Sequence, residues 1–356
     1  MGHILWFEEV GKENIGQVGG KNASLGELIK AGVKVPPGFA VTTMAYREFL
    51  RETGIEERVG EILSSLDVEE TEALQKASEE IRRLIEGASL PGGIRESIEK
   101  GYRELCRRLG TERVPVAVRS SATAEDLPTA SFAGQQDTYL WVEGTEEVTK
   151  KVMKCWGSLF TPRAIAYRVK MGFPHEKVAI SVGVQKMVNA KAAGVMFTLD
   201  PTTGDPSKVV IEGSWGLGEA VVSGSVTPDK FVVDKVTMEV SKTISPKTLE
   251  CVFDPERGEV VHAVVPEERQ RCECLGEEEV RELANLAKRI EDYYGGPQDI
   301  EWSIDREISF PENVFIVQSR PETVWSQKRK EPVLGKKTGF ELLMERAMTR
   351  IKVTKG

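Results

Sequence analysis

The sequence has few of the residues that mark secreted, membrane or nucleic-acid-binding proteins. Only five of its 356 residues are cysteines, and an odd number in a long chain argues against a secreted disulfide framework. The first ten residues lack the basic and apolar segments of a signal peptide, and no apolar run approaches the roughly 20 residues of a membrane helix. The formal net charge of -8 disfavours a general nucleic-acid binder, because such proteins are normally basic. We therefore expect a soluble, cytoplasmic protein with no membrane or nucleic-acid partner.

Other familiar sites are also missing. Cys272 and Cys274 have no second Cys/His pair at zinc spacing, so we expect no zinc site there. The glycine-rich stretch at residues 19–22 lacks the spacing of a Walker A motif, which disfavours a P-loop kinase. Histidine is scarce, with three copies, His3, His175 and His262, and His175 is interpreted as an ordinary surface residue.

What the chain contains is a mixture of helix-forming and strand-forming segments in a sequence that is 40% hydrophobic and 29% charged. Its periodicities predict an α+β protein in two lobes. The expected helical segments are 44–112, 145–171 and 277–294, and the expected strands are 114–119, 136–142, 177–189, 192–199, several within 207–264, 299–304 and 314–319.

The last thirty residues differ in composition from the rest. From Lys328 onward, lysine and arginine outnumber glutamate. Six apolar residues there share one face of a predicted helix: Phe340, Leu343, Met344, Ala347, Met348 and Ile351. This face either packs back on its own lobe or docks on a partner subunit.

Two basic residues stand where they could bind an anion. Arg119 ends the apolar stretch 114–118, and its planar fork of donors suits phosphate oxygens. The small-residue loop 129–135 that follows could cover those phosphates with backbone N–H groups. Lys21 follows two glycines that we expect to form a loop leading into a helix, whose dipole would favour an anion. Taken alone, Lys21 could equally be a solvated surface charge.

A pair of acids near residue 300 indicates a metal site. The two-residue period of a strand puts Asp299 and Glu301 on one face, where two carboxylates repel each other unless a cation lies between them. Oxygen ligands at this density suit Mg²⁺, which keeps several waters and shares phosphate oxygens. Gln318 and Arg320 also share a face of their strand. If the two strands are neighbours, the metal site adjoins a phosphate-binding arginine, although a solvated strand face could also carry these acids.

Seven motifs together resemble the amino-terminal nucleotide-binding domain of the phosphoenolpyruvate synthase and pyruvate phosphate dikinase family, which rifampin phosphotransferase shares. They occur at residues 19–26, 116–138, 184–188, 193–198, 216–219, 298–301 and 318–323. The resemblance implies an ATP-grasp fold in which two lobes, residues 1–190 and 191–325, clamp the nucleotide. Residues 326–356 would form a basic tail with an amphipathic helix.

The same resemblance implies the roles of individual residues. Lys21, Arg119 and Arg320 would contact the ATP phosphates and stabilise the transferring phosphoryl group. The loop 131–138 would close over them, with Gly134, Gln135 and Thr138 binding the nucleotide. The adenine pocket would be lined by Gln185, Met187 and Val188. Mg²⁺ would be held by Glu301 and Gln318, with Asp299 in support.

Members of this family pass a phosphoryl group to a histidine on a swivelling domain, and the matching acceptor segment is absent here. We therefore expect an ATP- and Mg²⁺-dependent dikinase-type subunit that phosphorylates a histidine of a partner subunit or of a missing domain. A separate subunit, as in phenylphosphate synthase, is the favoured arrangement. The final acceptor would be phenol, pyruvate or another small molecule. The alternative is a non-catalytic module that senses nucleotide and regulates a partner.

Overall fold

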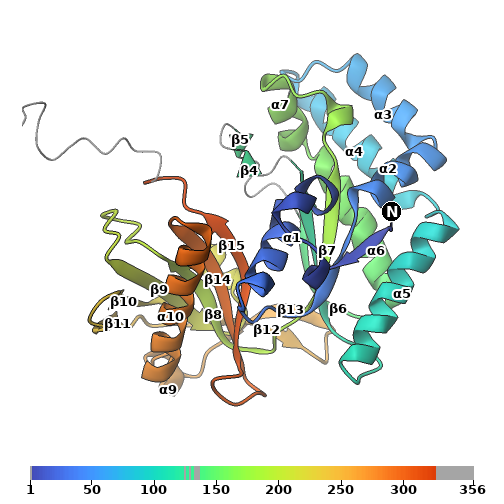
Figure 1. Ribbon diagram of the computed structural model, residues 1–356. Helices are drawn as coiled ribbons and strands as arrows, with labels where there is room; N and C mark the ends of the chain where they lie inside the picture. Colours follow the sequence, from blue (N-terminus) through green and yellow to red (C-terminus); the bar gives the residue numbers. More distant parts are fainter. Residues whose placement is uncertain (1, 124–125, 128–129, 132–136, 326–356) are drawn as a thin grey trace, which may run out of the picture. The chain divides into compact units, whose positions relative to one another are not determined.

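Two antiparallel β-sheets organise the part of the chain that the computed structural model describes, residues 2–123, 126–127, 130–131 and 137–325 (Figure 1). The first sheet has the strand order β1 (Ile4–Trp6), β2 (Gly38–Val41), β7 (Ile180–Lys186), β3 (Val116–Ala122) and β6 (Thr138–Val142). The second has the order β11 (Val240–Thr243), β10 (Asp229–Asp234), β9 (Lys208–Trp215), β8 (Ala190–Phe197), β14 (Gln298–Asp305) and β15 (Val314–Pro321). Both sheets belong to one compact unit, Met1–Pro321.

The first sheet is covered differently on its two faces. Alternate residues of a strand point to opposite faces, and in β3 Val116 and Val118 join a large apolar core. That core is built with six helices: α2 (Thr43–Glu52), α3 (Ile55–Ser64), α4 (Thr71–Gly87), α5 (Gly92–Arg108), α6 (Thr145–Gly157) and α7 (Pro162–Lys170). Ala117, Arg119 and Ser121, which alternate with the core-facing residues of β3, point to the other face. That face is therefore left for α1 and for the cavity described below.

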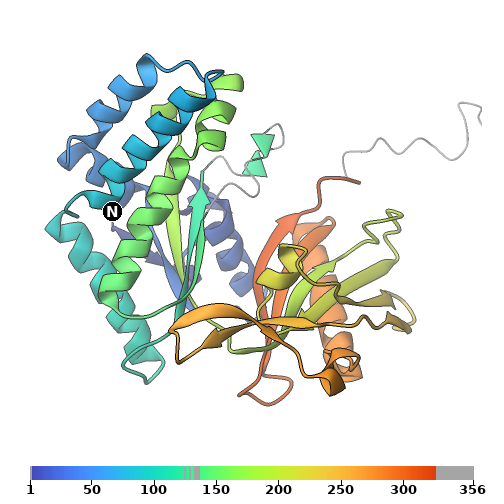
Figure 2. The ribbon, with the colours of Figure 1, turned by 180° about the vertical axis from the view of Figure 1, so that it is seen from behind.

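The second sheet buries one face against the amphipathic helix α10 (Glu277–Tyr294), whose apolar residues recur at helical spacing. In β14, Ile300 and Trp302 belong to this core, whereas Asp299 and Glu301 on the opposite face stay partly exposed. Figures 1 and 2 show α10 on one side of the sheet and the hairpin β12 (Leu249–Asp254) and β13 (Glu259–Val264) on the other. The polar face of β14, which carries Asp299 and Glu301, is thus turned away from α10.

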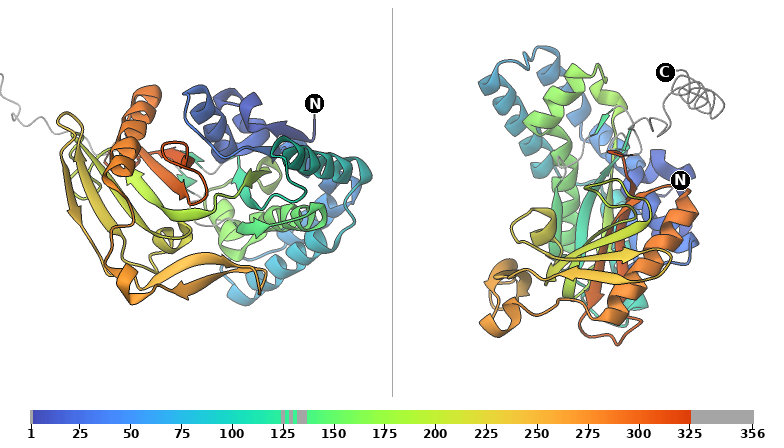
Figure 3. Two further views of the ribbon diagram at one scale, coloured as in Figure 1. Left: turned by 90° about the horizontal axis from the view of Figure 1, so that it is seen from below. Right: turned by 90° about the vertical axis from the view of Figure 1, so that its left-hand side faces the viewer.

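The hairpin β12–β13 reaches from the second sheet to the edge of the first (Figures 2 and 3). At that contact the ring of Phe253 stacks on Trp141 of β6, with centroids 4.7 Å apart and planes 10° from parallel. Trp141 has a φ of 58°, a left-handed conformation that is uncommon for a bulky side chain. Aromatic stacking of this kind stabilises by about 0.5–1.5 kcal/mol beyond the buried area. The stack helps to explain why the strained conformation is kept.

Most of the expected elements are confirmed, and two are corrected. The mixed α and β architecture, the helical segment 44–112, the helix 277–294 and the strands near 300 and 316 are all present. The segment 145–171 is helical as expected but is not one continuous helix, because α6 is followed by a short 3-10 turn at Ser158–Phe160 and α7 begins at Pro162. Thr161 caps that new helix, its hydroxyl accepting from the backbone N–H of Ala164.

The second correction concerns residues 15–30, where the helix α1 (Ile15–Lys30) starts before the two glycines rather than after them.

The smaller sheet β4 (Asp126–Leu127) and β5 (Ala130–Ser131) lies in the loop after β3. The predicted tail 326–356, with its apolar face from Phe340 to Ile351, lies outside the described residues. No helix in the described ranges has the length and apolarity needed to cross a membrane.

Candidate nucleotide site

Lys21 is carried by a helix that is broken at a glycine. α1 is helical on both sides of Gly19, whose φ of 72° lies in the left-handed region. Contact also requires glycine here, because an added Cβ would lie 2.3 Å from the carbonyl oxygen of Ser121. A new helical segment therefore begins beside Lys21, and the Lys21 Nζ donates to the carbonyl of Ser120 at 3.4 Å. The break brings α1 against β3, the strand of Arg119.

Asn22 fastens this broken helix to the first sheet. It is 2% exposed, and its Nδ2 donates to the carbonyl of Val18 at 2.9 Å and to Ser181 Oγ at 3.1 Å. Gly183 leaves the room for it, since a Cβ at that position would lie 2.4 Å from Asn22 Oδ1. Gly183 is also the residue of β7 directly opposite Arg119. Lys21 and Arg119 are consequently set in one rigid arrangement.

Arg119 links the first sheet to the polar residues of the second. Its Nη2 donates to Gln318 Oε1 at 2.6 Å and to Glu301 Oε2 at 3.1 Å, and its Nη1 donates to the carbonyl of Val317 at 3.1 Å. The Arg119 side chain is 18% exposed, so these charge-assisted bonds are partly shielded from water. Thr138 lies opposite Arg119 on the neighbouring strand β6.

The two polar strands of the second sheet are neighbours, in register. Glu301 of β14 pairs with Gln318 of β15, and Asp299 pairs with Arg320. Asp299 Oδ2 and Arg320 Nε lie 3.3 Å apart as an ion pair. A bulge follows Glu301, which changes the register from Trp302 onward. The adjacency that the sequence left open is therefore present, with two acids, an amide and an arginine on one patch of sheet.

A cavity of about 560 Å³ joins these groups. Nine of the residues predicted for the site line it: Lys21, Arg119, Thr138, Gln185, Met187, Val188, Glu301, Gln318 and Arg320. Asp299 is outside this lining, although its ion pair orients Arg320. Gly134 and Gln135 lie outside the described residues. The volume falls within the roughly 300–1,000 Å³ typical of small-molecule sites.

One wall of the cavity includes residues of the motif 216–219, which were given no individual roles from the sequence. Leu217 and Glu219 line it from the segment before and within the short helix α8 (Glu219–Val222). Gly216, with a φ of 75°, seats this segment on β12, since a Cβ there would lie 2.3 Å from the carbonyl of Cys251. The Cys251 thiol donates to Glu219 Oε2 at 3.9 Å, and burial together with that carboxylate raises the pKa of Cys251 to about 12. The thiol thus stays protonated as a donor.

Asp137 also lines the cavity; it lies within the loop 131–138 but was given no individual role from the sequence. Tyr139 Oη donates to Asp137 Oδ2 at 2.9 Å, and Arg82 lies 3.9 Å from the same oxygen. Burial, and then the charge of Asp137, raise the pKa of Tyr139, so the phenol remains a donor at neutral pH. Both groups offset the negative charge of Asp137 near the basic side chains. Signals for this arrangement are absent from the local sequence pattern.

The oxygen ligands in the cavity are too few to enclose a metal ion by themselves. They suit Mg²⁺, which takes its remaining ligands from water and phosphate. Glu301 and Gln318 offer one carboxylate and one amide oxygen on neighbouring strands, and both are bonded to the same Arg119 nitrogen. Among the described residues, no cluster of three or more His, Cys, Asp or Glu could form a closed metal site. Mg²⁺ usually takes one or two protein carboxylates and completes its shell with water and phosphate oxygens.

The three histidines are engaged elsewhere and do not line the cavity. His3 Nε2 lies 3.2 Å from Glu48, and His3 Nδ1 lies 3.0 Å from Ser97 Oγ. His175 Nδ1 accepts from Arg168 Nε at 2.9 Å. His262 is on β13, opposite Cys251. A phosphate-accepting histidine is therefore not among the residues that surround this cavity.

Comparison with known proteins identifies the family. Residues 15–338 match the family described as pyruvate phosphate dikinase, AMP/ATP-binding domain. The chain belongs to this family. The matched range includes α1, every strand of the two sheets except β1, and every lining residue named above.

Its curated relatives are considerably longer proteins. The chain is 51% identical to a probable phosphoenolpyruvate synthase of Staphylothermus marinus, over 94% of this chain and 43% of that protein. It is 47% identical to the phosphoenolpyruvate synthase of Aeropyrum pernix, over 92% of this chain and 43% of the relative. For the phosphoenolpyruvate synthase of Pyrococcus furiosus the identity is 43%, over 91% and 44%. The chain thus spans less than half of the length of these relatives.

Solved structures show only a slight similarity. The ADP complex of N5-carboxyaminoimidazole ribonucleotide synthetase covers 72% of this chain, and the chain covers 58% of it, at 11% identity and a TM-score of 0.25. A likeness of this size carries no argument about fold or ligand.

Proposed function

We propose that the chain binds ATP with Mg²⁺ and is the ATP-cleaving part of a dikinase-type phosphotransferase. The observation that carries the proposal is the single cavity in which Lys21, Arg119 and Arg320 meet Glu301 and Gln318. Membership of an AMP/ATP-binding family and relatives that bear the name phosphoenolpyruvate synthase support it. In this proposal the fold is an ATP-grasp, with lobes 1–190 and 191–325 on the two sides of the nucleotide.

The residues act mainly by binding and by electrostatics. The triphosphate lies among Lys21, Arg119 and Arg320, whose charges stabilise the negative charge of the transferring phosphoryl group. Glu301 and Gln318, with Asp299 in support, would hold Mg²⁺, which would neutralise phosphate charge when bound. Arg119 donates to Glu301 and Gln318, so it must release these oxygens, in exchange for phosphate, before they can bind the metal ion.

In this proposal the adenine base lies at the end of the cavity away from the phosphate-binding residues. Gln185 lies within β7, Met187 and Val188 follow directly after that strand, and all three are nearly buried. Met187 and Val188 form, with Ala117 and Leu217, an apolar surface of the kind that accepts a flat ring.

The nucleophile in the proposed reaction is a histidine outside this cavity, on a further domain or on a partner subunit. Its nitrogen attacks the β-phosphorus, the bond to the α-phosphate oxygen breaks, and the γ-phosphate is lost to water, so that AMP and phosphate are released. The phosphohistidine then passes its phosphoryl group to a small acceptor. The names of the relatives favour pyruvate over phenol.

The test is transfer of label from ATP. The chain is mixed with Mg²⁺, ATP labelled at the β-phosphorus and the histidine-bearing domain of a relative or neighbouring gene. We expect label on that domain and AMP in solution, and neither with Glu301→Ala or Arg320→Ala. Full transfer by either variant would contradict the site assignment. ATP binding without turnover, with every candidate domain, would instead indicate a nucleotide-sensing module.

A further inference from the structure

β15 is the edge strand of the second sheet, and side-chain and backbone groups of the first half of the chain bond to its backbone. An edge strand presents backbone groups that no neighbouring strand pairs. Here Arg119 donates to the carbonyl of Val317 at 3.1 Å, and Ser24 Oγ donates to the carbonyl of Ser319 at 2.7 Å. These two carbonyls flank Gln318, and Ser319 precedes Arg320. The strand that carries two site residues is therefore held through its backbone.

The two bonds differ in their relation to the cavity. Arg119 lines the cavity and, in the proposed function, exchanges some of its bonds to protein groups for bonds to phosphate. Ser24 lies outside the cavity lining, three residues beyond Lys21 on α1, and its bond can persist when the cavity is filled. Ser24 is thus a contact beside Gln318 and Arg320 that can keep β15 in place while Arg119 changes partners, and the backbone bond from the Ile316 N–H to the Lys34 carbonyl, at 3.0 Å, holds the preceding part of the strand.

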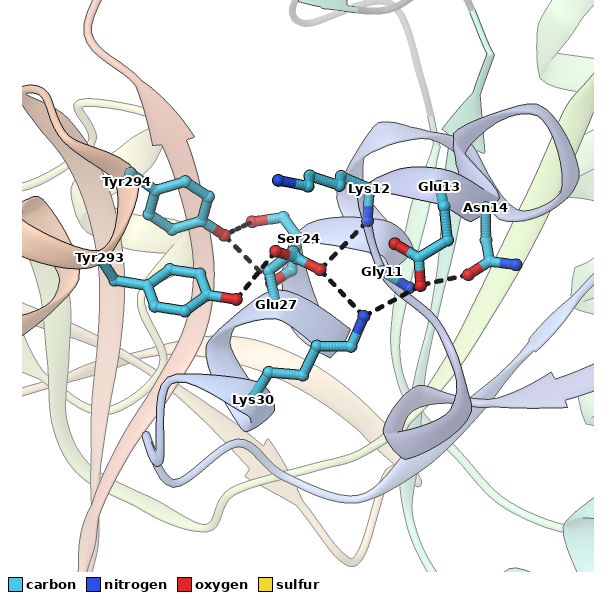
Figure 4. Close-up of polar contacts among 9 residues, drawn as sticks. All are labelled: Gly11, Lys12, Glu13, Asn14, Ser24, Glu27, Lys30, Tyr293 and Tyr294. Carbon is cyan, nitrogen blue, oxygen red and sulfur yellow. Dashed lines mark hydrogen bonds and ion pairs between the residues drawn. The ribbon is translucent and has the colours of Figure 1, made fainter.

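Tyr294 completes the arrangement from the last turn of α10. Its hydroxyl lies 3.2 Å from Ser24 Oγ and 3.4 Å from the carbonyl of Ser24. Ser24 has one hydroxyl hydrogen, and the short bond to Ser319 uses it, so Tyr294 is the donor to Ser24. Figure 4 shows Tyr293 and Tyr294 directed from α10 toward α1, where Tyr293 donates instead to Glu27 at 2.9 Å.

We propose that Ser24 and Tyr294 are positioning residues that join α1, α10 and β15 and thereby set the distance between Lys21 and the Gln318–Arg320 segment. The inference rests on the proposed function, because it concerns the phosphate end of the same cavity. Ser319 is 3% exposed, and its own hydroxyl donates to Gln298 Oε1 at 3.2 Å, so its backbone has little freedom to find another partner. Loss of the Ser24 hydroxyl leaves the Ser319 carbonyl without that donor.

The experiment compares the affinities of the chain for MgATP and for AMP, which lacks the phosphates that Gln318 and Arg320 would address. We expect Ser24→Ala and Tyr294→Phe to weaken MgATP binding about tenfold and to leave AMP binding unchanged. Ser24→Thr, which keeps a hydroxyl, should restore most of the MgATP affinity. Tyr293→Phe is the matched control, since it removes a bond between the same two helices that does not reach β15.

Three outcomes would overturn the inference. The first is that Ser24→Ala and Tyr294→Phe keep the wild-type affinity for both nucleotides. The second is that each variant loses affinity for MgATP and for AMP by the same factor, as a general destabilisation of the fold would cause. The third is Tyr293→Phe matching Tyr294→Phe. If the wild-type chain itself binds MgATP no better than AMP, the proposed function fails and this inference fails with it.

Discussion

Replacing Arg119 with alanine should change the affinities for nucleotide and for metal in opposite directions. A hydrogen bond to a charged group contributes about 1.5–3 kcal/mol, and 1.4 kcal/mol is a tenfold change in affinity, so losing one phosphate contact would cost about 10- to 100-fold. The guanidinium already bonds Glu301, Gln318 and the carbonyl of Val317, which offsets part of its gain from phosphate. We therefore expect MgATP to bind about tenfold more weakly.

The same substitution removes a cation 3.1 Å from Glu301 Oε2. Without it, the carboxylate and the Gln318 oxygen are available to a divalent ion, so Mg²⁺ or Mn²⁺ alone should bind more tightly than to the wild type. Calorimetric titration measures both affinities. Arg103→Ala serves as a control, because Arg103 is 61% exposed and pairs along its own helix with Glu99. Unchanged MgATP affinity in Arg119→Ala, or weaker binding of both ligands, would refute the reasoning.

Two further predictions concern stability. Lys247 and Asp229 are fully buried and 2.6 Å apart, so Lys247→Met, which leaves an unpaired buried carboxylate, should lower the free energy of unfolding by about 3–5 kcal/mol in a urea titration; a loss below about 1 kcal/mol would contradict this. Burial raises the pKa of Glu27, but bonds from Lys30, Tyr293 and the Lys12 N–H outweigh it, so the net pKa is below 4.5. Its ionised form therefore stabilises the fold above pH 4.5, and that contribution is lost as pH falls through the lowered pKa. Glu27→Gln should flatten the stability curve below pH 4.5, and an unchanged acid slope would exclude this role.

Local periodicity was sufficient to predict much of the fold. The spacing of apolar residues in α10 and the alternation in β14 each reflect one buried face, which is a property of neighbouring residues alone. The break in α1 at Gly19 was not predictable in the same way. Two adjacent glycines read as a turn, and only the approach of Ser121, about a hundred residues away, shows why the helix resumes.

The site residues likewise fall into those that a local pattern predicts and those that depend on the folded structure. Period-two reasoning placed Asp299 with Glu301 and Gln318 with Arg320, but the pairing of Glu301 with Gln318 depends on a register that only the folded sheet defines. Leu217 and Glu219 reach the cavity because Gly216 rests on Cys251. The tether through Ser24 joins residues almost three hundred positions apart. Contacts of this range have no signature in a local pattern.

The most direct test of the central claim is a crystal structure of the chain with Mg²⁺ and a non-hydrolysable ATP analogue. The proposal predicts phosphate oxygens within hydrogen-bond distance of Lys21, Arg119 and Arg320, a metal ion on Glu301 and Gln318, and the base against Met187. Nucleotide bound away from this cavity, or a metal ion that Glu301 does not contact, would contradict it.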